Sequence, residues 1–255
     1  KRLIVQPNTF NMYCHREPRF YLTVVWNGQW FKWENRNTNF LYGQPDGGPT
    51  HDAPQNGYLN RSRVSLDYIP RDNNHPYRPA IIFRMAEAYL SYAEALNESS
   101  ERMSHKQEIL DNLNKIRHRA GIAEYGTGTD ENGFTRIKIN FSDQKEVRRL
   151  IHKERRVEFV GEGVRYHDLR RWKTAHYGIG NLNEQGENPD WGVNGPDYGM
   201  NYYGTEYTDQ GDNAFFKRTK YMDRVYPRKF YWYPIHQSEI DKDPTLVQGP
   251  FWLGE

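Results

Sequence analysis

The sequence predicts a mostly α-helical fold with long irregular loops and a few short β-hairpins. Apolar residues recur with helical spacing in two stretches, residues 81–121 and residues 142–175. An Asn-Gly pair at Asn27-Gly28 separates two runs of β-forming residues, which is typical of a tight hairpin. Elsewhere long segments rich in Gly, Pro, Asn and Asp lack any periodicity and are expected to form loops.

Residues 1–80 are expected to contain a hairpin followed by loops. Residues 20–26 and residues 29–33 are rich in β-branched and aromatic side chains, and they flank the Asn-Gly pair. A hairpin here would place Trp26, Trp30 and Trp33 at or near its tip. The composition of residues 35–79 predicts loops, with a short strand over residues 63–68.

Residues 81–121 predict an antiparallel pair of helices. The first helix carries a stripe of small and apolar residues, and Ala residues at several positions allow a partner to approach closely. Ser104 and Gln107 fit a capping box for the second helix, and Gly121 fits its C-terminal cap. Such a pair is the unit of a tetratricopeptide repeat, although an ordinary helical hairpin would show the same local pattern.

Residues 142–175 predict one long central helix that begins at an N-cap, Ser142. Charged residues interleave with its apolar positions instead of keeping to one face. Because a buried unpaired charge is costly, we expect these residues to form ion pairs. Glu154 and Glu158 could also serve as a general acid and base, but neighbouring arginines favour ion pairing. The same interpretation applies to Asp168 with Arg165 or Arg171.

Residues 176–220 form a Gly- and Asn-rich segment with many aromatic residues and no periodicity. A loop of this length is usually functional or disordered, and a disordered loop is seldom so aromatic. Two interpretations stay open: a ligand-facing excursion, and simple packing over the core. Residues 221–255 are expected to close the chain with a turn and a last short helix.

Composition narrows the possible partners. The 255 residues include 35 basic and 33 acidic side chains, and a net charge of +2 gives no long-range field that would select nucleic acid. Aromatic residues make up 15% of the chain, and Tyr and Trp are enriched at binding surfaces. One cysteine, Cys14, excludes an internal disulfide, and no apolar run is long enough to span a membrane.

Catalytic motifs are absent from the sequence. None of the nine histidines falls in an H-E-x-x-H pattern, and there is neither a G-x-S-x-G elbow nor a glycine-rich phosphate loop. Asp209, Asp212 and Asn213 offer oxygen ligands but do not follow the calcium-loop pattern. We therefore expect a protein that is not an enzyme and that needs no cofactor or metal.

Four ordered stretches resemble the SusD/RagB family of nutrient-binding lipoproteins of the Bacteroidetes outer membrane. The most specific is E-R-R-V-E-F-V-G-E-G-V-R-Y-H-D-L-R-R-W at residues 154–172. The others are E-P-R-F-Y-L-T-V-V-W-N-G at residues 17–28, the helical pair of residues 83–122, and Y-W-Y-P-I-H-Q-S-E-I-D-K-D-P-T-L-V-Q-G-P-F-W at residues 231–252. His236 and Gly249-Pro250 depart from the closing motif of the family, which affects only local chain geometry.

The resemblance implies a tetratricopeptide-type superhelix, of which this chain would be the C-terminal portion. It also implies a surface-exposed location at the outer membrane, with a lipid anchor in an N-terminal part outside this sequence. The implied function is to capture an oligosaccharide and deliver it to a SusC-like TonB-dependent transporter. A peptide ligand, as in RagB-like uptake, is the main alternative. A glycoside hydrolase and a purely structural surface protein are the others.

The binding surface is predicted from the aromatic residues. A flat Trp or Tyr ring beside Asn, Gln, Asp or Arg can hold the apolar face and hydroxyl rim of a sugar, and it also suits a peptide. Each candidate could instead simply pack in the core or the hairpin. The candidate ligand-binding residues are Trp26, Trp30, Trp33, Trp191, Tyr198, Tyr202 and Tyr203.

Overall fold

The chain forms two compact units in the computed structural model. The described residues are 9–62, 64, 73, 77, 80–178 and 192–252, with only the backbone of Trp33. The first unit comprises residues 1–165 and 200–218, and the second comprises residues 166–199 and 219–255.

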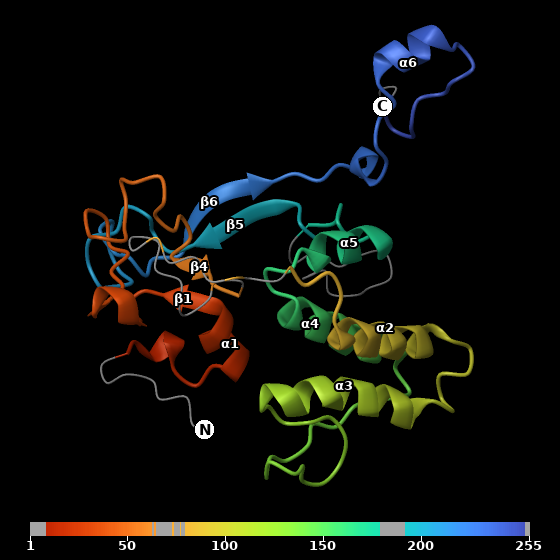
Figure 1. The fold of residues 1–255 in the computed structure, drawn as a ribbon, viewed down its shortest axis with the longest axis horizontal. Helices are drawn as coiled ribbons and strands as arrows, with labels where there is room; N and C mark the ends of the chain where they lie inside the picture. The colour runs from red at the N-terminus through yellow and green to blue at the C-terminus, as the bar shows by residue number, and fades with distance from the viewer. Residues whose placement is uncertain are drawn as a thin grey trace. The chain divides into compact units, whose positions relative to one another are not determined.

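Three packed helices form one core of the first unit (Figure 1). They are α2 (Met85–Glu98), α3 (Lys106–Ala120) and α4 (Gln144–Glu158). Leu90 of α2, Leu113 of α3 and Ile151 of α4 are fully buried in this core. The predicted helical pair is confirmed, and the superhelix built from such pairs stays a prediction.

The caps of α3 agree only in part with the sequence analysis. Gly121 ends the helix in a left-handed conformation with φ of +68°, as predicted. The predicted capping box is not formed, because His105 occupies the N-cap and no side chain caps the helix. Instead, a ring nitrogen of His105 lies 2.7 Å from a carboxylate oxygen of Glu108.

The central helix is broken, so the prediction of one continuous helix is wrong. Helix α4 ends at Glu158, and α5 (Val164–Arg171) follows after a short turn. Gly161 and Gly163 both have positive φ, a conformation that stops a right-handed helix. The start is also one residue later than predicted, because the N-cap is Asp143, whose carboxylate accepts from the backbone N–H groups of Lys145 and Glu146.

The two central glutamates of α4 are buried in ion pairs, as the sequence predicted. Arg117 donates to Glu154 at 2.9 Å, and Arg19 lies 2.7 Å from the other oxygen of Glu154. Glu158, whose side chain is 2% exposed, accepts from Arg19 at 3.1 Å and from Arg84 at 2.5 Å. Arg119 is a further partner of Glu158. The glutamates thus connect α1, the start of α2, α3 and α4, and their carboxylates are engaged in ion pairs.

A small β-structure carries the second core of the first unit. Its elements are α1 (Pro18–Thr23), β1 (Val24–Trp26), β2 (Trp30–Phe31), β3 (Arg36–Asn37) and β4 (Tyr58–Asn60). Strand β1 pairs antiparallel with β4 from Val24↔Asn60 to Trp26↔Tyr58, whereas β2 pairs with β3. The buried residues of this core are Phe40, Leu41, Met200 and Phe215.

The predicted hairpin between residues 20–26 and 29–33 is wrong in its pairing. The turn at Asn27-Gly28 does form, with Gly28 at φ of +86°. However, Pro18 starts a short helix over much of the first run, because its fixed φ suits the first helical position. The partner of β1 is β4, whose Tyr58 follows 32 positions later (58 − 26). The strand predicted over residues 63–68 lies outside the described residues, apart from Val64.

Residues 200–218 close this core from a distant part of the sequence. The N–H of Met200 donates to the carbonyl of Asn56, and the N–H of Asn201 donates to that of Phe215. The buried amide of Asn201 donates to the carbonyls of Asp212 and Ala214. Half of the predicted aromatic loop is therefore an ordered part of the first unit.

The second unit contains a strand where the sequence predicted only loop. Strand β5 (Gly195–Gly199) pairs antiparallel with β6 (Thr219–Arg224) from Gly195↔Arg224 to Gly199↔Thr219. Its core consists of Leu169, Ala175 and Tyr226. The strand escaped prediction because Gly-Pro-Asp-Tyr-Gly has little β-propensity.

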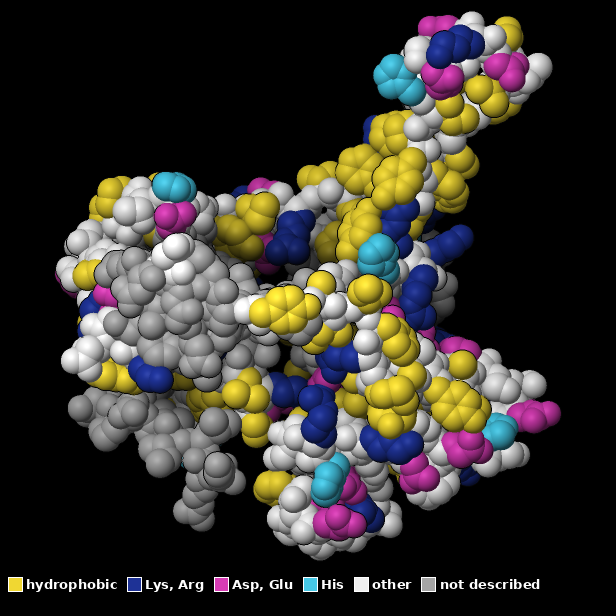
Figure 2. Space-filling model, viewed as in Figure 1, with side chains coloured by type: hydrophobic (Ala, Val, Ile, Leu, Met, Phe, Trp, Pro, Cys, Tyr) yellow, Lys and Arg dark blue, Asp and Glu magenta, His cyan; other side chains and the backbone are white. Residues whose placement is uncertain are grey.

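The C-terminal part of the second unit ends in a short helix, α6 (Gln237–Lys242), as predicted. Arg170 of α5 donates to the carbonyls of Phe230 and Tyr231, and Arg171 pairs with Asp168 at 2.9 Å. Hydrophobic side chains gather along the segment that follows β6 (Figure 2). Within the described ranges, no helix combines the length and the apolar character needed to cross a bilayer.

Candidate ligand-binding site

The β2–β3 hairpin exposes an indole ring beside an amide. Trp30 of β2 and Asn37 of β3 are directly opposed, so their side chains share a face of the hairpin. Trp30 is 46% exposed, and Asn37 is exposed as well. Asn35 closes the hairpin in a left-handed conformation with φ of +50°. The hairpin therefore presents a flat ring and a hydrogen-bonding group side by side.

Thr38 connects this hairpin to the turn that follows β1. Its carbonyl accepts from the N–H of Gly28 at 2.8 Å, and its own N–H donates to the carbonyl of Gln29 at 2.8 Å. The hydroxyl of Thr38 donates to the carbonyl of Trp26 at 2.7 Å. These bonds hold the Asn27-Gly28 turn against residues 37–39.

Asp46 holds the other side of the same segment. Its carboxylate accepts two hydrogen bonds from Arg36, at 2.6 and 2.9 Å, and a third from the N–H of Asn39 at 2.8 Å. Burial by itself would raise the pKa of Asp46, but the hydrogen bonds and the Arg36 charge outweigh it and lower that pKa. Asp46 is thus paired with Arg36, whose guanidinium also lies 3.8 Å from a carboxylate oxygen of Glu34.

Between these segments lies a pocket of about 340 Å³, which we call the asparagine pocket. Its lining residues are Thr9, Phe10, Asn27, Gly28, Asn37, Thr38, Asn39 and Tyr207. None of them carries a formal charge. Ring contacts tie its aromatic side to the core, since Phe10 lies 5.4 Å from Tyr207 and 4.7 Å from Phe216 between ring centroids.

Asn27 is the most deeply buried polar residue of the asparagine pocket. Its side chain is 1% exposed, and Oδ1 accepts from the N–H of Phe40 at 2.7 Å. Its Nδ2 is buried and has no hydrogen-bond partner among the described residues. A buried donor without an acceptor costs about 1–3 kcal/mol.

A second aromatic surface, the tyrosine cluster, consists of Tyr42, Tyr202 and Tyr203. The ring centroid of Tyr203 lies 5.6 Å from that of Tyr42 and 5.1 Å from that of Tyr202. Tyr202 is fixed by a hydrogen bond to the carbonyl of Thr50 at 3.3 Å, whereas Tyr203 is 69% exposed. The N–H of Tyr42 donates to the carbonyl of Gly204. Both the asparagine pocket and the tyrosine cluster therefore include residues from segment 39–42 and from residues 200–218.

The structure separates the predicted site residues into groups. Trp30 belongs to the hairpin beside the asparagine pocket, and Tyr202 and Tyr203 form most of the tyrosine cluster. Trp26 is only 7% exposed and stacks on Phe20 at 5.4 Å, so its ring is already covered by the protein.

Three other predicted site residues lie elsewhere. Tyr198 is exposed on β5 of the second unit. Only the backbone of Trp33 is described, and it lies in a short 3₁₀ helix (Lys32–Glu34). Trp191 lies outside the described residues.

Sequence reasoning missed most of the asparagine pocket. Asn27 was recognised only as a turn residue, and Asn37 and Asn39 only as parts of a loop. Tyr207 was one of several tyrosines in the aromatic segment without a distinguishing signal. The abundance of Asn beside aromatic residues in positions 27–39 was the one pattern that could have pointed to this site.

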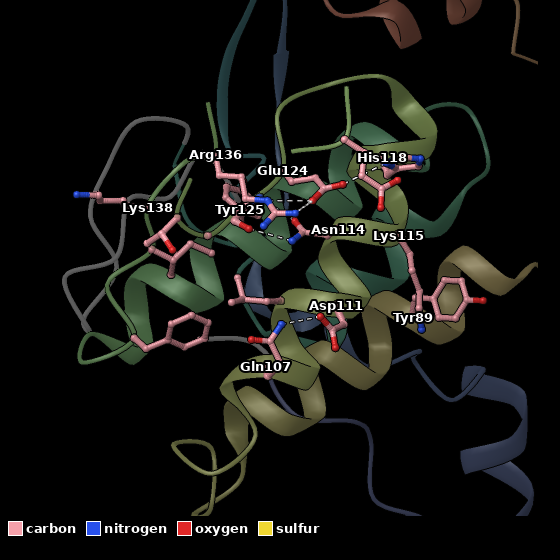
Figure 3. A pocket seen from close by; sticks show the side chains of 16 residues that line it. Tyr89, Gln107, Asp111, Asn114, Lys115, His118, Glu124, Tyr125, Arg136 and Lys138 are labelled. Atoms are coloured by element: carbon pink, nitrogen blue, oxygen red, sulfur yellow. Dashed lines mark hydrogen bonds and ion pairs between the residues drawn. The ribbon is translucent and has the colours of Figure 1, made fainter. Parts of the chain in front are cut away.

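A larger pocket, of about 900 Å³, lies between α3 and residues 122–141 (Figure 3). Several of its polar groups are paired with each other. Arg136 donates to Glu124 at 2.8 Å, His118 lies 3.1 Å from Glu124, and Gln107 donates to Asp111. The Lys115 ammonium lies 4.5 Å from the ring centroid of Tyr89 and covers that ring.

No metal centre can be built from the described residues, among which no three His, Cys, Asp or Glu side chains converge. His152 is buried with Glu94 at 3.8 Å, and His118 and His105 each lie next to one glutamate. These pairs are too small to form the ligand set of a metal ion.

Comparison with known proteins defines the class of the fold and then the family. A solved SusD-like protein from Bacteroides fragilis superposes with a TM-score of 0.64 and 26% identity, over 94% of this chain and 40% of that chain. A SusD-like carbohydrate binding protein from the same species superposes at 0.62 with 24% identity, over 93% of this chain and 42% of that one. At this identity the second likeness shows the fold alone.

The SusD family model matches residues 5–252, so the chain belongs to the SusD family. Two SusD-like proteins of Formosa agariphila are each 32% identical to it, over 109 and 103 residues. The aligned parts cover 43% and 40% of this chain but only 18% and 19% of those relatives. The chain thus spans about two fifths of the solved relatives and a smaller share of the curated ones.

Proposed function

We propose that this protein is a surface nutrient-binding protein that captures a glycan and delivers it to a SusC-like TonB-dependent transporter. Membership of the SusD family supports this role. By the same argument, the protein would sit on the outer membrane through a lipid anchor in a part outside residues 1–255. Capture requires no bond to be made or broken, so the protein would act as a binding protein and not as an enzyme.

The observation that carries the proposal is the asparagine pocket next to Trp30. Sugar hydroxyls both donate and accept hydrogen bonds, as does the exposed amide group of Asn37. The exposed indole of Trp30 can stack on the apolar face of a neighbouring sugar ring. The tyrosine cluster offers a second aromatic surface in the same unit, with the exposed ring of Tyr203. A relative with this fold is described as a carbohydrate binding protein, which agrees with the proposal.

Affinity electrophoresis tests the proposal. The full-length protein is run through native gels that contain a panel of polysaccharides, with calorimetry on oligosaccharides and peptides in parallel. We expect retardation by at least one glycan without release of reducing sugar. Trp30→Ala should weaken this retardation, whereas Trp232→Ala, which removes a similarly exposed indole of the second unit (39% exposed), should not.

Other outcomes would redirect the assignment. Binding of peptides without retardation by any glycan would contradict the glycan proposal in favour of RagB-like peptide uptake. Release of reducing sugar would contradict the non-catalytic role. Equal loss of retardation in Trp30→Ala and Trp232→Ala would contradict the location of the site.

A further inference from the structure

Residues 80–83, which we call the apolar segment, lead into α2 as exposed chain that belongs to no helix or strand. The segment reads Ala-Ile-Ile-Phe, and Met85 at the start of α2 continues the apolar run. Ile82 is 96% exposed, and Ile81, Phe83 and Met85 are each more than half exposed. Single apolar residues are common on protein surfaces, but a contiguous run of them marks a surface that another element covers.

The backbone of the apolar segment is unpaired as well. Among the described residues, the structure shows no hydrogen bond to the N–H or C=O groups of Ile81, Ile82 or Phe83. Arg84, the next residue, has extended backbone angles (φ −143°, ψ 155°), and Ile and Phe favour β-strands. Unpaired backbone groups along an apolar, β-forming stretch are the template to which a further strand adds.

Arg84 anchors the end of the apolar segment. Its guanidinium donates to the carboxylate of Glu158 at 2.5 Å and to that of Glu162 at 2.7 Å, and it lies 4.6 Å from the ring centroid of Phe159. A charged side chain can protect an exposed strand from pairing, but this charge is directed into α4 and the turn that follows it. The segment is therefore held in place without such protection.

We infer that the apolar segment pairs with a further β-strand, which the full-length protein supplies from outside residues 1–255. The solved SusD-like protein from Bacteroides fragilis matches 94% of this chain with 40% of its own length, so more than half of that relative lies outside the matched part. A strand of the same polypeptide has a high effective concentration and needs no second molecule. Because the side chains of the segment are apolar, the added strand should carry apolar side chains too.

Hydrogen–deuterium exchange of the full-length wild-type protein tests the inference. Residues 50–52 serve as an internal reference, since they are exposed and none of their N–H groups is bonded among the described residues. Neighbouring residues of a strand direct their N–H groups to opposite edges, so one or two amides of residues 81–83 would be paired. These amides should exchange at least about tenfold more slowly than the reference, equally at every dilution at which the protein is monomeric.

A charged variant tests the apolar contact separately. Ile82→Asp would be harmless on a free surface, but beneath an added strand the carboxylate loses its hydration. We expect this variant to exchange residues 81–83 as fast as residues 50–52 and to unfold at lower urea concentration than the wild type. Thr127→Asp adds the same charge at an exposed loop position of the first unit and should change neither property.

Three results would overturn the inference. Exchange of residues 81–83 in the wild type as fast as that of residues 50–52 would refute the added strand. Slow exchange that appears only at concentrations at which the protein dimerises would assign the segment to a second copy. Equal urea midpoints for Ile82→Asp and Thr127→Asp would contradict an apolar covering of Ile82. The gel experiments on glycan capture are decided independently of all three.

Discussion

The hydroxyl of Tyr207 donates a hydrogen bond of 2.9 Å to Oδ1 of Asn39, across 168 positions of the sequence. This bond ties residues 200–218 to the segment that lines the asparagine pocket. Tyr207 also lines the pocket with its ring, which is tilted against Phe10. One tyrosine therefore contributes both a wall of the candidate site and the hydrogen bond that positions Asn39.

Substitution of Tyr207 should separate these two contributions. Tyr207→Phe removes one hydrogen bond, which is worth about 0.5–1.5 kcal/mol, so glycan affinity should fall about twofold to tenfold. Tyr207→Ala also removes the ring and should weaken binding further. Calorimetry with the bound oligosaccharide measures both effects, and Tyr233→Ala, an exposed tyrosine of the second unit, serves as the control. Equal affinities for all three variants and the wild type would exclude Tyr207 from the site.

Glu158→Gln should destabilise the protein by about 3 kcal/mol or more. The substitution removes the buried carboxylate that Arg19 and Arg84 share, although Arg19 keeps Glu154 and Arg84 keeps Glu162. Loss of one partner from a buried ion pair typically costs about 3–5 kcal/mol. Urea unfolding measures the change. Glu146→Gln, in the first turn of the same helix, should stay within about 0.5 kcal/mol of the wild type. A Glu158→Gln protein as stable as the control would show that these ion pairs contribute little.

Alanine at Gly161 and at Gly163 should have unequal effects on stability. Both positions have nearly the same positive φ, so each alanine carries a backbone penalty of about 1 kcal/mol or somewhat more. At Gly161 the new Cβ would also lie 2.1 Å from Nδ2 of Asn60 and 2.4 Å from Oγ of Ser62, whereas at Gly163 it would meet open space. We expect Gly161→Ala to unfold at lower urea concentration than Gly163→Ala. Equal unfolding midpoints for the two variants would show that backbone strain, and not the contact with Asn60, dominates at this turn.

Glycan binding should be lost in acid through Asp46. Because the folded pKa of Asp46 lies below the ordinary aspartate value of 3.8, its stabilisation is complete above that value and disappears as pH falls through the folded pKa. Affinity should therefore be nearly constant from pH 7 to about pH 5 and should fall below about pH 4. Asp46→Asn, which has no charge to lose, should bind more weakly at pH 7 and show a flatter profile. Identical acid profiles of variant and wild type would exclude Asp46 as the cause.

Much of the helical part was predictable because its signals are local. The spacing of Leu90, Leu113 and Ile151 marks helix faces, and Gly121 marks a helix end, within a few residues of sequence. The pairing of Glu154 and Glu158 followed from their place among apolar residues, since buried charges need partners. The break after Glu158 had a visible signal in Gly161 and Gly163, but the strong helical pattern on both sides outweighed it.

The candidate site was much less predictable because its parts meet only in the folded chain. Asn27 looked like a turn residue, and nothing near it in the sequence shows that its amide is buried beside Phe40. Trp26 and Trp30 looked equivalent, yet burial against Phe20 covers the first ring and the hairpin exposes the second.

The amino-acid sequence alone predicts most of the helices and some of their caps. It also indicates that the charged residues of the central helix must form ion pairs, and it shows the resemblance to a family. Each of these depends on residue types at short spacing. The tertiary structure decides that β1 pairs with β4, that residues 200–218 join the first unit, and that an uncharged pocket forms beside Trp30. The physical reason is that hydrogen bonds such as the one from Tyr207 to Asn39 connect residues far apart in the chain. Only packing of the two cores brings such residues within reach of each other.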